Sequence, residues 1–256
     1  MRNIILITLF FLTLNAQETE VNLEEKQKLT IGLGAYVQSQ PYKGIDSFVV
    51  PSPVVFFDNG LFYIRWSRAG IYFLGDKQEN FSWGFSLTAQ PRVFGYNPQN
   101  SEELKGMDER ETTFEGGLAF SALYNTTYIE IMLLTDLLDR YDSWLIKTEI
   151  GDEFELGHFT FYPSLIVSYQ SEEFVNYYYG VTQEEADRIP SLNSYEPGGG
   201  FQVGVQTYVE HPITDELSVL LNFRADSIPY TARNSPILDS SVIYSGLASL
   251  IYTFKY

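Results

Sequence analysis

The chain has 256 residues, a formal net charge of −17 and no cysteine. Its length allows one large domain or two small ones, and no linker divides it. The acidic balance argues against direct nucleic-acid binding, which needs a basic face, and the lack of cysteine excludes disulfides and thiolate metal sites. Aromatic residues make up 16% of the chain, which suits β-strands and the aromatic girdles of membrane interfaces.

Residues 1–16 have the pattern of a secretory signal peptide. Arg2 precedes an apolar core from Ile4 to Leu14, and Ala16 lies at the expected cleavage point. Residues 17–28 are polar and are expected to form a short periplasmic N-terminal segment. No later segment offers the ~18–20 continuous apolar residues of a helical span. An exported chain of this kind, rich in alternating strands, belongs in the periplasm or, as a barrel, in the outer membrane.

From residue 29 onward, apolar and polar residues alternate with the period of two that indicates β-strands. The predicted strands are 29–38, 48–57, two within 61–74, 81–90, 112–124, 128–138, 144–151, 159–170, 201–210, 217–226 and 242–256. Pro51 and Pro53 interrupt the second strand, so this region is expected to be irregular.

Connection lengths alternate along the second half of the chain. Loops at 92–110, 171–198 and 229–240 are long, whereas the turns at 125–127, 157–158 and 211–216 are short. Bacterial outer-membrane barrels have short periplasmic turns and longer outside loops. Both termini are therefore expected in the periplasm.

The strand count depends on the ambiguous segment from Leu61 to Leu74. Periplasmic termini require an even number of strands, so this segment must split near Ser67–Gly70. The sequence therefore predicts an all-β fold, a closed antiparallel transmembrane β-barrel over 29–256 with about 12 strands. Ten strands would result if 48–57 and one half of 61–74 did not cross. A soluble β-sandwich or lipocalin-like barrel is the alternative fold.

The last predicted strand runs from Val242 to Tyr256 and places Tyr252, Phe254 and Tyr256 on its apolar face. Outer-membrane barrels usually end on such an aromatic strand, and by that resemblance the three residues are the signal read by the barrel assembly machinery. Closure of the barrel would pair this strand with the first one, 29–38.

Six charged residues fall on the inward faces of the predicted strands: Glu115, Glu130, Lys147, Glu149, Arg224 and Asp226. Opposite charges across a lumen can plug it by ion pairing or set the selectivity of a pore. A barrel of about 12 strands has a small interior, so a packed or narrow lumen is expected.

The sequence offers no catalytic, cofactor or metal site. His158 and His211 both lie in predicted short turns, away from a serine on the barrel wall, whereas a Ser/His/Asp triad needs these groups side by side. The acidic runs at 101–103 and 152–155 are interpreted as solvated loops. Gly198-Gly199-Gly200 leads into a strand, whereas a phosphate loop precedes a helix.

Several stretches, among them GLGAYVQSQPYKGIDSFVVPSPVV, YYYGVTQEEADR and YEPGGGFQVGV, resemble the MltA-interacting protein (MipA/OmpV) family in order over almost the whole mature chain. The residues that carry the resemblance are Pro41, Tyr42, Gly44, Pro53, Gly60, Tyr178, Gly180, Val181, Ser235, Pro236, Tyr252 and Phe254. The block IPYTARN departs from the family pattern by lacking a Leu-Gly-x-Ala-Ala run.

This resemblance implies an outer-membrane protein of a Gram-negative bacterium with no assigned catalytic residues. Some family members are described as scaffolds that join a lytic transglycosylase to a murein synthase. The leading hypothesis is therefore a non-enzymatic scaffold for peptidoglycan-remodelling enzymes, embedded in outer-membrane lipid. A narrow channel for small solutes is the second hypothesis, and an outer-membrane hydrolase is disfavoured.

Overall fold

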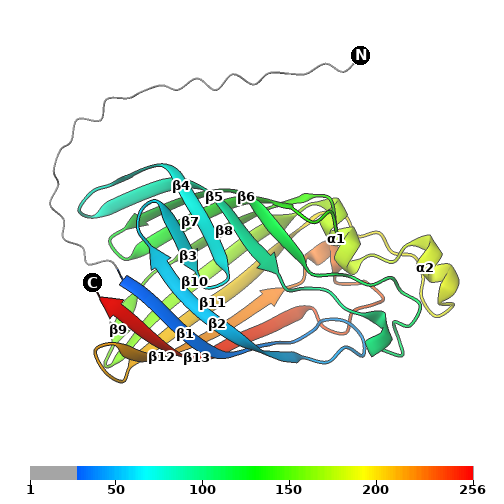
Figure 1. Cartoon of the computed structure of the whole chain (residues 1–256). Helices are drawn as coiled ribbons and strands as arrows, with labels where there is room; N and C mark the ends of the chain where they lie inside the picture. Colours follow the sequence, from blue (N-terminus) through cyan, green and yellow to red (C-terminus); the bar gives the residue numbers. More distant parts are fainter. Residues whose placement is uncertain (1–27, 256) are drawn as a thin grey trace, which may run out of the picture.

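The computed structural model of the protein describes residues 28–255. The predicted signal peptide, residues 17–27 of the predicted N-terminal segment and Tyr256 lie outside the described residues. The described chain forms one sheet that closes on itself, with short helices only in the connections (Figure 1). In this part of the chain no helix has the length and apolar character needed to cross a membrane.

The strands in chain order are β1 (Lys28–Gln38), β2 (Phe48–Asp58), β3 (Phe62–Arg65), β4 (Arg68–Lys77), β5 (Phe81–Arg92), β6 (Thr113–Tyr124), β7 (Thr127–Asp136), β8 (Trp144–Gly151), β9 (Phe154–Leu156), β10 (Phe159–Gln170), β11 (Gly200–Pro212), β12 (Leu217–Ser227) and β13 (Val242–Lys255). The helices are the 3-10 turns η1 (Pro98–Asn100) and η2 (Tyr230–Ala232), and α1 (Glu172–Tyr179) and α2 (Gln183–Arg188).

The barrel closes between its first and last strands. β1 pairs antiparallel with β13, from Leu29 opposite Phe254 to Gln38 opposite Ser245, which confirms the predicted contact. β8 and β9 follow one another along β10, and β10 pairs with β11 on its other side. The 13 strand segments therefore make a closed antiparallel barrel of 12 strands. The predicted count of 12 is confirmed, and the alternatives of ten strands and of a sandwich are wrong.

The segment from Leu61 to Leu74 divides into two strands, as the parity argument predicts. β3 pairs with β4 through Arg65 opposite Arg68, and Trp66 with Ser67 makes the turn between them. β3 has only four residues and pairs with the last three residues of β2. The β3–β4 turn therefore lies part of the way along the wall of the barrel rather than at its rim.

The region around Pro51 and Pro53 is a regular strand, so the prediction of irregular structure was wrong. β2 is continuous from Phe48 to Asp58 and pairs with β1 along nearly its whole length. Proline lacks the N–H group that a strand offers to its neighbour, and it is tolerated where the neighbour is absent. Both prolines lie beyond the end of β3, where β2 has no partner on that side.

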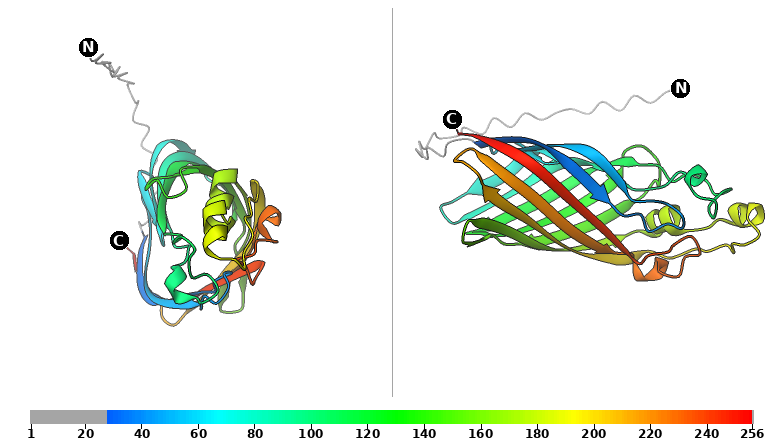
Figure 2. Two further views of the ribbon diagram at one scale, coloured as in Figure 1. Left: turned by 90° about the vertical axis from the view of Figure 1, so that its right-hand side faces the viewer. Right: turned by 90° about the horizontal axis from the view of Figure 1, so that it is seen from below.

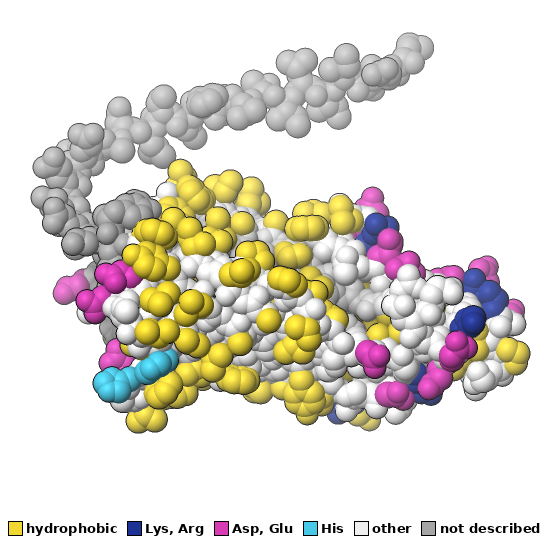
Figure 3. Space-filling model, turned by 60° about the horizontal axis from the view of Figure 1, so that its bottom comes forward, with side chains coloured by type: hydrophobic (Ala, Val, Ile, Leu, Met, Phe, Trp, Pro, Cys, Tyr) yellow, Lys and Arg dark blue, Asp and Glu magenta, His cyan; other side chains and the backbone are white. Residues whose placement is uncertain are grey.

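Apolar side chains cover the outside of the barrel. Most strands alternate between exposed apolar side chains and inward ones, as Leu33 and Leu87 illustrate with exposed fractions of 66% and 59%. Exposed apolar side chains occur on strands all around the barrel. On the face shown in Figure 3 they form a band, and charged residues gather beyond it toward both ends. A band of this kind is the surface that an outer-membrane barrel presents to lipid.

The two ends of the barrel differ. Short turns join the strands at the end that carries both described termini, which we call the turn end, and the longer connections gather at the opposite loop end (Figures 1 and 2). Residues 171–198, expected to be a loop, contain α1 and α2. Ser171 caps α1, and Thr182 with Glu185 forms a capping box on α2. Seen along the barrel axis, α1 lies across the mouth of the loop end (Figure 2).

Glycine allows the close approach of β1 and β13. A Cβ atom on Gly34 would lie 2.3 Å from the carbonyl oxygen of Ala248, whereas a Cβ on Gly198 meets nothing within 4 Å. We expect Gly34→Ala to lower the free energy of unfolding by about 1–3 kcal/mol, because the seam must spread to admit a methyl group. Gel electrophoresis of unboiled samples measures this change, because the folded barrel migrates as a separate band that disappears with increasing urea. Equal midpoints for Gly34→Ala and the control Gly198→Ala would contradict the prediction.

Candidate functional site

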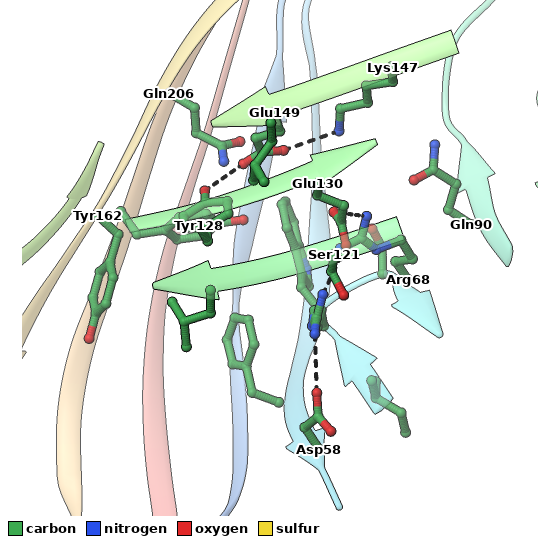
Figure 4. A pocket seen from close by; sticks show the side chains of 18 of the residues that line it. Asp58, Arg68, Gln90, Ser121, Tyr128, Glu130, Lys147, Glu149, Tyr162 and Gln206 are labelled. Atoms are coloured by element: carbon green, nitrogen blue, oxygen red, sulfur yellow. Dashed lines mark hydrogen bonds and ion pairs between the residues drawn. The ribbon is translucent and has the colours of Figure 1, made fainter. Parts of the chain in front are cut away.

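A cavity of about 2000 Å³ occupies the inside of the barrel (Figure 4). At the turn end it is bordered by the turns at 58–60 and 76–80, and at its other limit it reaches Phe94 below the long loops. Inward side chains of the strands line it, and many of them are polar or charged. The cavity is therefore a cup that opens at the turn end.

Five of the six charged residues predicted to face the lumen line this cavity, namely Glu130, Lys147, Glu149, Arg224 and Asp226. The sixth, Glu115, is on the same inward face but is fully buried near the loop end. The structure thus brings together inward charges from strands that are far apart in the sequence.

The charges on β8 and β12 form ion pairs within each strand. Lys147 Nζ lies 3.5 Å from one carboxylate oxygen of Glu149, and Tyr128 OH donates a hydrogen bond of 2.8 Å to the other. Arg224 binds Asp226 through Nε and Nη2, at 2.6 and 2.8 Å. Each pair joins residues two apart on one strand, which point to the same side of the sheet. The cup wall thus contains compensated charges.

Glu130 on β7 is shared by two arginines from the β3–β4 hairpin. Arg65 Nη1 lies 2.9 Å from Glu130 Oε1, and Arg68 pairs with the other oxygen. Arg65 Nη2 also donates hydrogen bonds of 3.1 Å to Asp58 Oδ2 and 2.7 Å to Tyr72 OH. The side chain of Glu130 is only 5% exposed. This cluster joins β7 to the β3–β4 hairpin on the inside of the wall, where only β5 and β6 separate them (Figure 4).

Arg65 and Arg68 were missed by the sequence analysis. Whether these two side chains point into the lumen depends on the residue at which the segment 61–74 turns. The alternation of apolar and polar residues does not determine that residue. The sequence feature that could have identified them is the spacing of the two arginines. They flank a two-residue turn at Trp66 and Ser67 and therefore lie directly opposite each other.

Glu115 ties the wall to the loops above it. Its carboxylate pairs with Arg92 and accepts hydrogen bonds of 2.8 Å from Gln90 Nε2 and 3.0 Å from Tyr141 OH. Tyr141 belongs to the connection between β7 and β8. A fully buried carboxylate needs such partners, so Glu115 holds this connection against the strands.

The loop end is closed by a packed aromatic cluster that we call the cap core. It consists of Tyr42, Phe94, Tyr96, Phe174, Tyr178 and Tyr179, all buried. The rings come from three different connections, and the centroids of Tyr42 and Tyr96 are 4.4 Å apart. Burial raises the pKa of Tyr42 well above its usual value, so its hydroxyl stays neutral. Such close packing of side chains from separate loops closes the barrel above the cup.

A buried ion pair next to the cap core joins α2 to the connection between β5 and β6. Arg110 Nη2 lies 2.8 and 3.1 Å from the two carboxylate oxygens of Glu185. Burial alone would lower the pKa of Arg110, but Tyr96 and Glu185 raise it above its usual value. Glu185 also accepts a hydrogen bond from the backbone N–H of Thr182. One carboxylate thus both caps α2 and binds the connection between β5 and β6.

The two histidines lie at the turn end. His211 Nδ1 is 3.2 Å from the carbonyl oxygen of His158, and the His211 ring packs on Phe159. Across residues 28–255 no group of three or more His, Asp and Glu side chains could hold a metal ion. The five predicted inward charges that line the cup are each held in an ion pair.

The predicted assembly signal lies on the outer surface of β13. The exposed rings of Tyr252 and Phe254 pack edge to face, with centroids 4.7 Å apart. Tyr256 lies outside the described residues. The role of these residues in recognition by the assembly machinery stays a prediction.

The sequence matches a family described as MltA-interacting protein MipA over residues 31–254. It is 24% identical over 229 residues to the putative outer membrane protein YiaT of Escherichia coli K12, covering 89% of this chain and 91% of that protein. It is 26% identical over 237 residues to the MltA-interacting protein of the same organism, covering 90% of each chain.

Among solved structures, an outer membrane channel from Pseudomonas putida F1 resembles the chain with a TM-score of 0.44 and 8% identity. The alignment covers 91% of this chain and 97% of the channel.

Removal of the Glu130 carboxylate should destabilise the barrel. Glu130→Ala leaves Arg65 and Arg68 facing each other without their shared partner, and we expect a loss of about 3 kcal/mol in the free energy of unfolding. Urea unfolding in detergent micelles, followed by tryptophan fluorescence, measures it. The control is Glu102→Ala, which removes an exposed pair with Lys105 at 3.8 Å and should stay within about 0.5 kcal/mol of the wild type. Similar losses in both variants would show that the shared carboxylate contributes little.

Proposed function

The chain belongs to the MltA-interacting protein family of outer-membrane proteins, and from this we propose that it is a non-enzymatic barrel that anchors peptidoglycan-remodelling enzymes at the periplasmic face of the outer membrane. The partners we propose are a lytic transglycosylase, which the name of the relative suggests, and a murein synthase. A narrow channel for small solutes is the second candidate.

One observation carries this proposal, which is the difference between the two ends of the barrel. The cap core fills the loop end, and the cup opens at the turn end. We place the turn end in the periplasm, because short turns face the periplasm in bacterial barrels. A partner in the periplasm then meets an open, rigid cup, whereas a solute arriving from outside meets packed aromatic rings.

The charge of the turn end supports a partner with a basic surface. The exposed acidic residues there include Glu79, Asp152, Glu153, Glu155 and Glu216. Carboxylates around a rim steer and orient an oppositely charged partner. The short turns offer little surface of their own, so we assign the contact to this rim together with the mouth of the cup.

Charge reversal at the rim should weaken docking. In the pair variant Glu153→Lys/Glu216→Lys we expect the Kd for the lytic transglycosylase of the same organism to rise about tenfold, because like charges then face each other. Surface plasmon resonance with the folded protein in detergent micelles measures it. The matched control, Glu102→Lys/Glu103→Lys, makes the same charge change at the loop end and should leave the Kd unchanged. Equal Kd values for both variants, or no binding by the wild type, would refute rim docking.

Conductance in planar bilayers separates the two candidate functions. We expect no unitary steps from the wild type, because the cap core blocks the loop end. Glu185→Ala removes the buried partner of Arg110 and should produce steps as the cap loosens. Glu184 is the exposed neighbour on the same helix, and Glu184→Ala should remain silent. Steps of equal size from the wild type and both variants would instead favour the channel.

A further inference from the structure

The wall of the barrel has a gap between β2 and β5. β3 pairs only with Phe56–Asp58 of β2, and β4 pairs with β5 only as far as Ala89. The stretch from Phe48 to Val54 and the stretch from Gln90 to Arg92 therefore face each other across the β3–β4 turn without a strand between them. In Figure 1 the two strands border this gap on the loop-end side of the short hairpin.

Three prolines line the two sides of this gap. The backbone N–H of Trp66 binds the carbonyl oxygen of Val55, so residues of β2 with the same parity, Pro51 and Pro53, direct their nitrogen atoms toward the gap. On β5 the carbonyl oxygen of Phe81 accepts a hydrogen bond from the backbone N–H of Gln78 on the β4 side. Pro91 has the same parity as Phe81, so its nitrogen atom also points toward the gap. At these three positions the backbone therefore has no N–H group that would lack an acceptor.

The prolines reduce the cost of leaving a sheet edge open beside lipid. An unpaired backbone polar group in hydrocarbon costs several kcal/mol, and open edges persist only where they line a water-filled cavity. Each proline removes one such N–H group. The carbonyl groups that remain can turn to the water of the cup. The prolines also prevent another strand from adding to either edge, because it would find no N–H groups to bind.

Residues that border the gap belong to the lining of the cup on one side and to the apolar outer surface on the other. Val50, Ser52, Trp66, Arg68 and Gln90 border the gap and also line the cup. The side chain of Val50 has the inward parity of buried Ser52 and Val54, yet it is 41% exposed. On the outside, the exposed side chains of Val49 and Leu87 belong to the apolar band.

An aromatic residue forms the edge of the gap nearest the turn end. Trp66 has φ of 56°, a conformation that is rare for a bulky residue. Its Nε1 donates a hydrogen bond of 3.0 Å to Ser52 Oγ, and its ring packs against Tyr36 at 5.5 Å. The turn thus holds the indole on the lumen side of the gap, where it offers an apolar surface with a polar edge.

We propose that this gap is a lateral opening through which a small amphiphilic molecule with a hydrocarbon chain passes between the bilayer and the cup. The apolar rims and the Trp66 ring receive the hydrocarbon part, and the cup, lined by polar and charged side chains, receives the polar part. The opening adds a ligand route to the barrel and does not depend on the docking of cell-wall enzymes.

Lipid access to the gap can be measured because the chain has no cysteine of its own. A bimane label is attached to Val50→Cys, and the protein is reconstituted in bilayers of phosphatidylcholine with brominated acyl chains. Bromine quenches only at short range, so the label on Val50→Cys should lose fluorescence to an extent comparable with Val49→Cys on the outer surface.

The matched control is Gln202→Cys, which lines the same cup on the closed wall of β11. Its label should keep the fluorescence that it has in bilayers of ordinary phosphatidylcholine. The proposal is overturned if the label on Val50→Cys is quenched no more than the one on Gln202→Cys.

A second measurement uses the native indole and needs no label. In Trp83→Phe/Trp144→Phe, Trp66 is the remaining tryptophan of the three in the chain. We expect brominated lipid to quench it, although its hydrogen bond to Ser52 holds it on the lumen side. The comparison is Tyr208→Trp, a lumen position on β11, in a background with all three tryptophans replaced by phenylalanine. Equal, weak quenching of both indoles would also overturn the proposal.

Discussion

Backbone hydrogen bonding in hydrocarbon is the constraint on which this structure depends. Water cannot satisfy N–H and C=O groups there, so a sheet that crosses the membrane must close on itself. The pairing of β1 with β13 provides that closure, and the apolar band and polar interior follow from the alternation of side chains on each strand. The stretch of wall between β2 and β5 that lacks a partner strand is bordered by Pro51, Pro53 and Pro91, residues that have no N–H group to satisfy.

The same requirement explains how the interior carries charge. A formal net charge of −17 could leave carboxylates in the lumen that repel one another. The inward carboxylates of Glu130, Glu149 and Asp226 are instead each paired with an arginine or lysine side chain. Unpaired acidic residues lie instead in the connections, where water screens them. The barrel wall is thereby close to electrically balanced, and its acidic character appears at the ends.

The sequence predicted the parts of the fold that depend on local pattern. Alternation located the strands, and the parity of the strand count required the division of the segment 61–74. Alternation also identified the inward charges, because neighbouring strand positions point to opposite faces. It could not identify Arg65 and Arg68, whose facing depends on the position of one turn, nor interpret Pro51 and Pro53, whose meaning depends on the length of the neighbouring strand. The cap core was beyond prediction because its rings come from separate loops and meet only by tertiary packing.

Closure between β1 and β13 has a consequence for how the barrel forms. The hydroxyl groups of Thr30 and Thr253 bind each other across 223 residues of sequence. Bringing together two ends of a flexible chain of this length costs about 5 kcal/mol of entropy, from the logarithmic dependence on loop length. Until β13 pairs with it, the free edge of β1 can pair with any other exposed strand. The seam therefore carries the largest loop-closure cost of the strand pairings in the barrel. A chain shortened at its end would keep an unpaired strand edge that can aggregate.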